Sequence, residues 1–488
     1  MTLDGAILAD GTDGGSWGGG SGGGVNVRAT VLRGAGLIQA QGGNGEGGGG
    51  GGRVAVWASD LSGFDTARIT AHGASARCGT GTVYLRDTDQ SSGTLIIAGL
   101  PPYPAGVENN CSEGSTPLNA PGQVAIGFAD RVVISGLVSA RVDIPVEFRN
   151  GLEVRDWAQL IASTILADTV SLRTRGRITS PDQSDAGPVA LDVRVTGILF
   201  VDSTGSIDVS RKGYLSGLTD GNLPVPTALG SSGGSLGGRG GGRNGVSPET
   251  YGDPLDPDEP GGGGPIFPRE PAGTAGGGVI RIHAGTLLLN GSVVADGLSR
   301  WPQGGSGAGG SIFLDVDTLS GTGRASACGG YSWSGGTGGG GRIAVYYRNL
   351  DGFDPTRIQA AGNNTAPDGV TGQPGTVHLV NGVLRTHVRT PVPAGINGGY
   401  HDRPIGGSVT LRFNRAIDVA SFDPTMLTVA GQMGTVRAVG VTEVGDRTYR
   451  FDLDRELTED GGLPLQLVVG PARRRRFRAR PGWRRHPR

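Results

Sequence analysis

The sequence predicts an all-β protein in which a glycine-rich β-solenoid, built from parallel β-helix-like repeats, is followed by a small β-sandwich. Three observations lead to this prediction. The chain repeats itself at long range, a shorter glycine-containing phrase recurs within each copy, and apolar residues alternate with polar ones as β-strands require. Helical periodicity is almost absent, so we expect few helices.

The long-range repeat has two aligned blocks. Residues 23–43 align with residues 310–330 without a gap and share 7 identities in 21 positions. Residues 53–73 align with residues 342–362 and share 11 identities in 21 positions. The opening part of the chain is therefore a second copy of the region near 288–388. Structural modules are commonly duplicated with their surroundings, whereas a nucleotide-binding loop seldom is, so the duplication indicates architecture.

The shorter repeat is the phrase Gly-x-apolar-x-Ala-x-Gly and its variants. Adjacent phrases are spaced by 29 to 33 residues. Alternate side chains of a strand share a face, so the apolar and alanine positions predict a buried face. The flanking glycines predict bends or places where two backbones come close. The phrases begin at Gly5, Gly36, Ala67, Gly176, Gly205, Gly291, Gly323 and Thr356.

A second, longer strand type lies between these phrases. With two strand signals in each period, a turn of the chain buries its inner face only by stacking on the next turn, which predicts a solenoid. Residues 129–178 have the same β character without glycine runs, and we assign them to the start of a full unit. The longer strands are expected at 25–32, 53–58, 279–289, 311–319 and 342–347.

Two glycine-rich stretches need separate interpretation. The run Gly47–Gly52 belongs to a GxGxxG match, but a strand follows it, whereas a dinucleotide site needs a helix there. We therefore predict a turn or a close-packed extended crossing. The 60-residue stretch Ser216–Ala275 is rich in Gly, Pro and Ser, and a structureless loop of that length is uncommon. It is either a mobile flap or an insertion packed through its glycines.

These patterns divide the chain into four parts. Residues 1–98 form a partial glycine-rich unit, and residues 99–390 form a full unit with the long loop at 216–275. Residues 391–471 form the sandwich. Residues 472–488 are an arginine-rich tail that holds 9 of the 43 Lys and Arg residues, and we interpret it as out-of-frame translation or a disordered segment. The alternative, a basic arm for nucleic acid, is disfavoured, so we expect no nucleic-acid partner.

The glycine-rich segments GGSGAGGSIFLDVDTLSGTGRASACGG, GGTGGGGRIAVYY and GTVHL resemble repeat modules of very large bacterial surface and secreted proteins. The resemblance covers about 2–98 and 270–388. It implies an extracellular or cell-surface location and an architectural role. The chain also begins inside a repeat without a cap, and the tail replaces an expected last strand. We therefore expect a fragment of a longer protein.

Residues 405–471 are similar to the S-layer-type bacterial Ig-like domain. Short alternating strands spaced by turn residues agree with a small sandwich. The strands are expected at 409–413, 426–429, 436–442, 448–453 and 465–469. The side chains expected in its core are Phe413, Leu427, Val429, Tyr449, Phe451, Leu465 and Leu467.

Catalytic signals are weak. Gly-x-Ser-x-Gly occurs at Gly19–Gly23 and Gly230–Gly234, but such matches are expected by chance among 95 glycines. Solenoid lyases and hydrolases act through clustered carboxylates with Arg or Lys, and the best candidates are Asp202, Asp208, Arg211 and Lys212. We interpret these as solvent-facing residues on the edge of a repeat, and we predict no catalytic residues and no enzymatic activity.

Candidate metal ligands are equally sparse. The acidic residues Asp253, Asp256, Asp258 and Glu259 make a weak calcium candidate, since carboxylates on a loop suit a large hard cation. They lack the EF-hand glycine, and a solvated acidic loop is the alternative. No cofactor other than this calcium is expected. The cysteines Cys78, Cys111 and Cys328 have no zinc spacing, and a Cys78–Cys111 disulfide stays open.

Together these features favour a non-enzymatic structural or adhesive module of a large bacterial cell-surface or secreted protein. Its partners would be cell-surface or matrix components, glycans among them. The alternative is a carbohydrate-binding or carbohydrate-cleaving β-helix protein. Trp57 and Tyr346 occupy equivalent positions of the two copies and are the glycan-stacking candidates, although cross-strand packing explains them as well. No apolar run approaches the roughly 20 residues of a membrane helix, so no spanning segment is expected.

Overall fold

The computed structural model forms two compact units, Met1–Leu384 and Arg385–Arg488. The fold is all-β, as the sequence predicts, and short 3₁₀ turns are the only helices among the described residues. The residues that the structure describes are 1–76, 78–101, 115–183, 187–224, 231–242, 245–265, 274–299, 304–363, 370–382, 393–396, 408–413, 419, 427–431, 434–445, 448–454 and 465–467.

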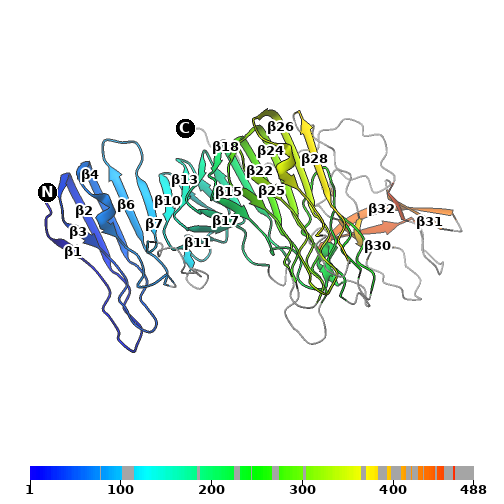
Figure 1. Ribbon diagram of the computed structural model, residues 1–488, viewed down its shortest axis with the longest axis horizontal. Helices are drawn as coiled ribbons and strands as arrows, with labels where there is room; N and C mark the ends of the chain where they lie inside the picture. Colours follow the sequence, from blue (N-terminus) through cyan, green and yellow to red (C-terminus); the bar gives the residue numbers. More distant parts are fainter. Residues whose placement is uncertain are drawn as a thin grey trace. The chain divides into compact units, whose positions relative to one another are not determined.

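A 15-stranded sheet extends through the described part of the first unit (Figure 1). Its main path is β2-β4-β6-β7-β10-β13-β16-β18-β22-β24-β26-β28, and β9, β12 and β15 lie off this path. The strands are β2 (Gly24–Gly34), β4 (Arg53–Phe64), β6 (Thr82–Asp87), β7 (Thr94–Ala98), β9 (Ile126–Phe128), β10 (Arg131–Ser135), β12 (Val146–Phe148), β13 (Leu152–Arg155), β15 (Thr164–Ala167), β16 (Val170–Leu172), β18 (Leu191–Val201), β22 (Val279–Leu289), β24 (Ser311–Ser320), β26 (Arg342–Asp351) and β28 (Thr376–Asn381). The long strands expected from the sequence are all in this sheet.

The short strands of the glycine phrases form two further sheets. The order is β1-β3-β5 in one and β27-β25-β23-β19-β17-β14-β11-β8 in the other, and the pairing is parallel. The strands are β1 (Ala6–Leu8), β3 (Leu37–Gln39), β5 (Ile69–Thr70), β8 (Ser115–Pro117), β11 (Ser139–Val142), β14 (Gln159–Ala162), β17 (Arg177–Thr179), β19 (Ser206–Asp208), β23 (Ser292–Val294), β25 (Arg324–Ser326) and β27 (Ile358–Gln359). Long and short strands alternate along the chain, which confirms the predicted solenoid.

The two copies fold into the same series of elements. Strands β1 to β6 correspond in order to β23, β24, β25, β26, β27 and β28. Even the short 3₁₀ helices agree: η1 (Thr66–Arg68) and η4 (Pro355–Arg357) sit at equivalent places. Each is capped by an aspartate, since Asp65 accepts a hydrogen bond from the amide of Ala67 and Asp354 accepts one from Thr356. The duplication is therefore one of structure as well as of sequence.

Two of the hydrophobic clusters formed by the described residues of the first unit meet at β7. One core is built from β1–β6 and includes Val83. The other runs from β7 to β27 and includes Ile97 and Ile134. Strand β7 pairs antiparallel with β6 and parallel with β10, and it contributes Ile96 to the first core and Leu95 and Ile97 to the second. Because neighbouring strand residues point to opposite faces, the cores lie on opposite sides of the sheet at β7.

The middle of the unit has shorter turns than the copies. Leu152 in β13 pairs with Val132 twenty residues earlier and with Val170 eighteen residues later. In this region, one side of a solenoid turn is formed by two short strands, such as β15 and β16, and no single long strand spans it. Both then pair with the single long strand β18. The sequence did not predict this change in turn length, because these residues lack the glycine phrase.

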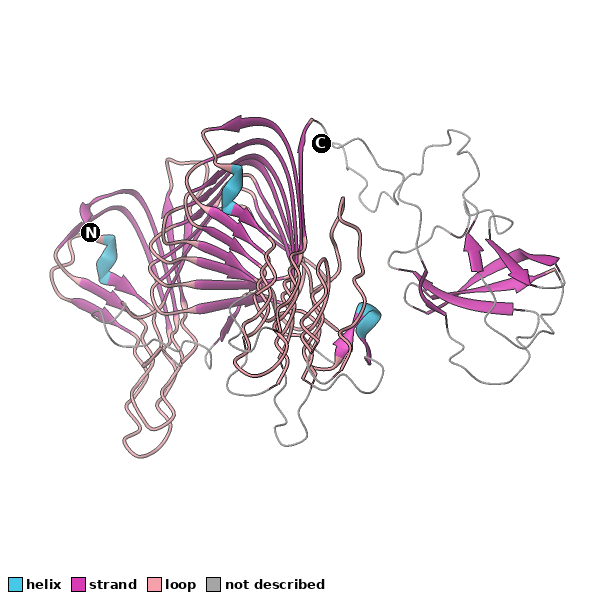
Figure 2. Cartoon of the chain, turned by 45° about the vertical axis from the view of Figure 1, so that its right-hand side comes forward, coloured by secondary structure: helices cyan, strands magenta, loops and turns pink. Residues whose placement is uncertain are grey.

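The glycine runs are ordered backbone layers that lie side by side (Figure 2). The alanine carbonyl of each phrase accepts a hydrogen bond from the last glycine before the next long strand, at 2.6 to 2.8 Å. Gly51 and Gly340 each lie against this closing bond in the following layer. A Cβ there would stand 1.8 Å from the carbonyl oxygen of Ala71 and 2.0 Å from that of Ala360. Only glycine permits this close approach, which explains why the sequence has glycine runs at these positions. The six closing pairs are Gly23–Ala9, Gly52–Ala40, Gly81–Ala71, Gly310–Ala295, Gly341–Ala327 and Gly375–Ala360.

The described parts of the long 216–275 stretch are packed through glycine. Residues 231–241 are mostly buried, and Gly234, Gly238 and Gly241 donate hydrogen bonds to Ser306, Gly340 and Thr337 of the glycine layers. The stretch also contains β20 (Leu218–Thr219), η3 (Asp220–Asn222) and β21 (Leu223–Pro224). Of the two interpretations, the insertion fits these residues.

The second unit is antiparallel. Its described strands are β29 (Pro393–Ile396), β30 (Ser408–Phe413), β31 (Leu427–Gly431), β32 (Gly434–Gly445), β33 (Thr448–Leu453) and β34 (Leu465–Leu467), in the order β29-β30-β33-β32-β31-β34. The five strands expected there are present, and β29 is an addition. Tyr449 and Phe451 are fully buried, as expected of core residues. The tail 472–488 lies outside the described residues. Nowhere in the described chain is there a helix with the length and apolar character to cross a membrane.

Candidate functional site

The side chains of β2, β4 and β6 that point away from the first core form a surface that we call the N-terminal face. Strand alternation places inward residues such as Val54 and Val56 in the core and their neighbours on this face. The face consists of Asn26, Arg28, Thr30, Arg53, Ala55, Trp57, Ser59, Tyr84, Arg86 and Thr88.

Trp57 stands at the centre of this face. Its cross-strand partners are Arg28 on β2 and Arg86 on β6. The Arg28 guanidinium lies 5.4 Å from the centroid of the Trp57 ring, and the Tyr84 ring lies 5.2 Å away at a tilt of 59°. These contacts hold the indole in place and leave it half-buried. The ring borders a depression of about 420 Å³ lined by Arg28, Ala29, Thr30, Trp57, Ser59 and Thr88.

The charges of the N-terminal face are all positive. Arg86 pairs with Asp130 at 3.5 Å, and the Tyr84 hydroxyl donates a hydrogen bond to the same carboxylate at 3.0 Å. Partial burial and the Asp130 carboxylate raise the pKa of Tyr84, so its hydroxyl stays protonated. Among the described residues, neither Arg28 nor Arg53 has a carboxylate partner. The face therefore presents two arginines that no acidic side chain neutralises.

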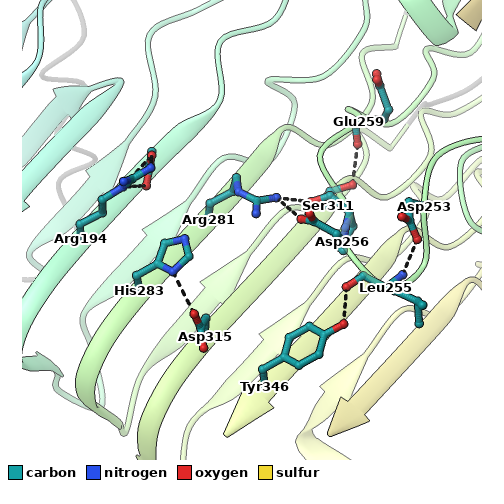
Figure 3. Close-up of polar contacts among 12 residues, drawn as sticks. Arg194, Asp253, Leu255, Asp256, Glu259, Arg281, His283, Ser311, Asp315 and Tyr346 are labelled. Carbon is teal, nitrogen blue, oxygen red and sulfur yellow. Dashed lines mark hydrogen bonds and ion pairs between the residues drawn. The ribbon is translucent and has the colours of Figure 1, made fainter. Parts of the chain in front are cut away.

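The equivalent surface of the second copy is covered. Residues 251–260, which we call the strap, cross the outward side of β22, β24 and β26 (Figure 3). Tyr346 donates its hydroxyl hydrogen bond to the Leu255 carbonyl at 2.7 Å, and Arg342 donates to the Tyr251 carbonyl at 2.7 Å. Arg281 binds the Asp256 carboxylate at 2.6 Å. The insertion thus closes in one copy what is open in the other.

Tyr346 is not available for glycan stacking, contrary to the prediction. Only 2% of its surface is exposed, and its ring packs between Phe313 at 5.7 Å and His378 at 5.9 Å. The strap that covers it precedes the second copy in the chain, before β22 and β23. The alignment of the two copies therefore placed Trp57 and Tyr346 together correctly, but could not reveal that one of them is covered.

The four carboxylates proposed for calcium point to separate partners. Asp253 accepts a hydrogen bond from the Leu255 amide at 2.8 Å, and Asp256 is bound by Arg281. Glu259 is 7% exposed and accepts a hydrogen bond from the Tyr214 hydroxyl at 3.0 Å. Asp258 contributes to the field that acts on Arg281. Within the described ranges, no group of three or more His, Cys, Asp or Glu side chains could hold a metal ion. These contacts hold the strap in place.

The proposed catalytic carboxylates likewise do not converge. Asp202 accepts hydrogen bonds from the amides of Thr174, Thr204 and Gly205 at 2.6 to 2.8 Å. Partial burial raises the pKa of Asp202, but these bonds outweigh it, and the pKa lies below its ordinary value. Asp208 pairs with Arg177 at 3.1 Å.

The remaining candidates also have structural surroundings. Lys212 pairs with Asp182, and the Arg211 amide donates to the Asp296 carbonyl. Ser232 of the second Gly-x-Ser-x-Gly match is fully buried among the glycine layers, so it is no exposed nucleophile. Cys78 and Cys328 are free thiols, while Cys111 lies outside the described residues.

No protein-family model, curated protein or solved structure matches the chain. The resemblances to glycine-rich surface modules and to the S-layer-type Ig-like domain therefore stay predictions. Within the described residues, the N-terminal face combines an aromatic ring that borders a depression with two cations that no carboxylate neutralises.

Proposed function

We propose that this chain is a non-enzymatic structural and adhesive module of a large bacterial cell-surface or secreted protein. The observation that carries the proposal is the repeated closing bond between alanine and glycine, which joins successive layers through backbone atoms alone. An array held in this way keeps surface side chains at fixed positions along the solenoid, with strands about 4.8 Å apart. Its action is geometric, since it presents a surface and spaces it from its neighbours.

The second unit fits a spacer of the Ig-like kind, and we place both units outside the cell. Duplication with retained structure supports this role, because array-forming modules grow by repetition. A second candidate function, carbohydrate binding, is favoured by the half-buried Trp57 ring and the depression that it borders. Carbohydrate cleavage is disfavoured, because Asp202 and Asp208 are each engaged in a local structural contact.

The proposal is tested with beads that carry the full chain. We expect the beads to be retained under flow on immobilised extracellular polysaccharide, and heat-unfolded chain to lose this retention. In parallel, the soluble chain should release no new reducing ends from the same polysaccharide. If beads that carry the native chain are not retained, the adhesive role is contradicted. Steady release of reducing ends would contradict the non-enzymatic role.

A further inference from the structure

We propose that the N-terminal face binds an acidic polysaccharide, with the Trp57 ring against a sugar ring and Arg28 and Arg53 paired with its carboxylates. This inference rests on the proposed adhesive function and names the chemical class of its ligand. Four features of the face support it: the ring, the charge, the hydroxyl groups and the contrast with the second copy.

The ring provides an apolar platform on a flat surface. Trp57 is fixed from one side by the tilted Tyr84 ring, whose hydroxyl is anchored on Asp130. A face of a sugar ring carries C–H groups of partial positive charge, which the negative face of an indole attracts. The Arg28 guanidinium that lies over the indole is exposed, and an exposed contact of this kind is weak, so a sugar ring can replace it at small cost.

The charge selects an anionic sugar. Arg28 and Arg53 lack a carboxylate partner in the described part of the chain, and the face itself carries no acidic side chain. Guanidinium groups bind carboxylates through two parallel hydrogen bonds, which fixes both position and orientation. Arg86 is already paired with Asp130, which leaves the pairing with the ligand to the other two arginines.

Hydroxyl groups line the far side of the depression. Ser59 and Thr88 share a hydrogen bond of 2.7 Å, and Thr30 lies beside them. Each hydroxyl both donates and accepts, which suits the hydroxyl groups of a sugar. An apolar surface with a few polar groups around it is the usual composition of a small-ligand site.

The second copy shows what the same surface looks like in a structural role. The position of Arg28 is occupied there by Asp315, which binds His283 at 3.2 Å, and the position of Thr30 by Asp317, which binds Arg348 at 3.1 Å. The strap then covers the ring of Tyr346. The outward face of the second copy thus makes internal contacts through Asp315 and Asp317, whereas the N-terminal face has Arg28 and Thr30 at these positions.

The test is calorimetric titration of the full chain with two carboxylated probes, an oligogalacturonate and an oligoalginate. We expect binding of at least one probe, weakened at least tenfold by Trp57→Ala and by Arg28→Ala. Methyl esterification of the same oligogalacturonate keeps the sugar rings and removes the charge, so it should weaken binding at least tenfold as well. Added salt should weaken binding of the acid form, because the pairing is electrostatic.

Trp157 supplies the matched control. It is 38% exposed, and the Arg175 guanidinium lies 4.1 Å from its ring centroid, but it belongs to a turn between β13 and β14. Trp157→Ala should leave binding unchanged. Thermal unfolding of each variant verifies that it is folded. Arg28→Ala removes only an exposed side chain, so the binding of this variant tests the inference if Trp57→Ala does not fold.

Three results would overturn the inference: no binding of either probe, equal binding of the esterified oligomer, or binding that neither Trp57→Ala nor Arg28→Ala weakens. These outcomes are separable from failure of the proposed function. Beads of the Arg28→Ala variant that are still retained on extracellular polysaccharide would preserve the adhesive role and reject this face as its ligand site.

Discussion

Replacement of Gly51 by alanine tests the role of the glycine runs at a single atom. An ideal Cβ at Gly51 stands 1.8 Å from the Ala71 oxygen and 2.5 Å from the Gly81 nitrogen, which are the two atoms of a closing bond. Ordinary carbon–oxygen contact begins near 3.4 Å, so the two layers must part. Overpacking of this kind costs about 1–3 kcal/mol, and loss of the hydrogen bond adds about 1 kcal/mol.

The matched control is Gly47→Ala in the same glycine run. The nearest atom to a Cβ there is the Gly18 Cα at 4.0 Å, so the methyl group fits. Alanine at a compatible position restricts the unfolded chain and adds about 0.4–1 kcal/mol of stability. Urea unfolding of the full chain should therefore place Gly51→Ala about 2–4 kcal/mol below the parent and Gly47→Ala at or above it. Equal free energies of unfolding for the two variants would refute the close-packing explanation.

Three further predictions concern side chains that precede the second copy in the chain. Burial and the Glu259 charge raise the pKa of Tyr214, so the stability that its neutral hydroxyl gives is present below about pH 10 and is lost above it at about 1.4 kcal/mol per pH unit. In urea unfolding between about pH 9 and 11.5, the free energy of unfolding should fall less steeply for Tyr214→Phe than for the parent, and an equal slope would contradict this. Asp202→Ala should lower the free energy of unfolding by about 1–3 kcal/mol, since three amides lose their acceptor. Because the pKa of Asp202 is lowered, the difference in stability from the parent should vanish as the pH falls well below 4. A variant as stable as the parent at pH 7 would contradict this prediction. Calcium and a chelator should give the same melting temperature, because Arg281 engages Asp256; a rise of several degrees in calcium would reinstate the metal site.

The sequence predicted the fold where one local pattern repeats. The glycine phrases and the alternating strands state which residues face inward, and the structure places Ala40, Ala71 and Ala327 in the core as expected. The physical reason is that each layer meets nearly the same neighbours, so each repeats the same solution.

Pairing between dissimilar segments could not be predicted. Strands β6 and β7 both alternate in the ordinary way, and nothing in their residues states that β7 runs antiparallel and divides two cores. The strap is a similar case, because its prolines and acidic residues are typical of a solvated loop. In the structure Glu259 is buried and accepts a hydrogen bond from Tyr214, and the Tyr251 carbonyl accepts one from Arg342, so both partners are far along the chain. The strap also covers Tyr346, one of the two glycan candidates.

Amide hydrogen exchange across Gly47–Gly52 tests the central claim most directly. The amides of Gly49, Gly51 and Gly52 donate to backbone carbonyls at 2.9, 3.0 and 2.7 Å. We predict that they exchange about as slowly as the amides of β4, because they open only when neighbouring layers separate. Exchange of these three glycine amides at the rate of an unstructured chain would contradict the account.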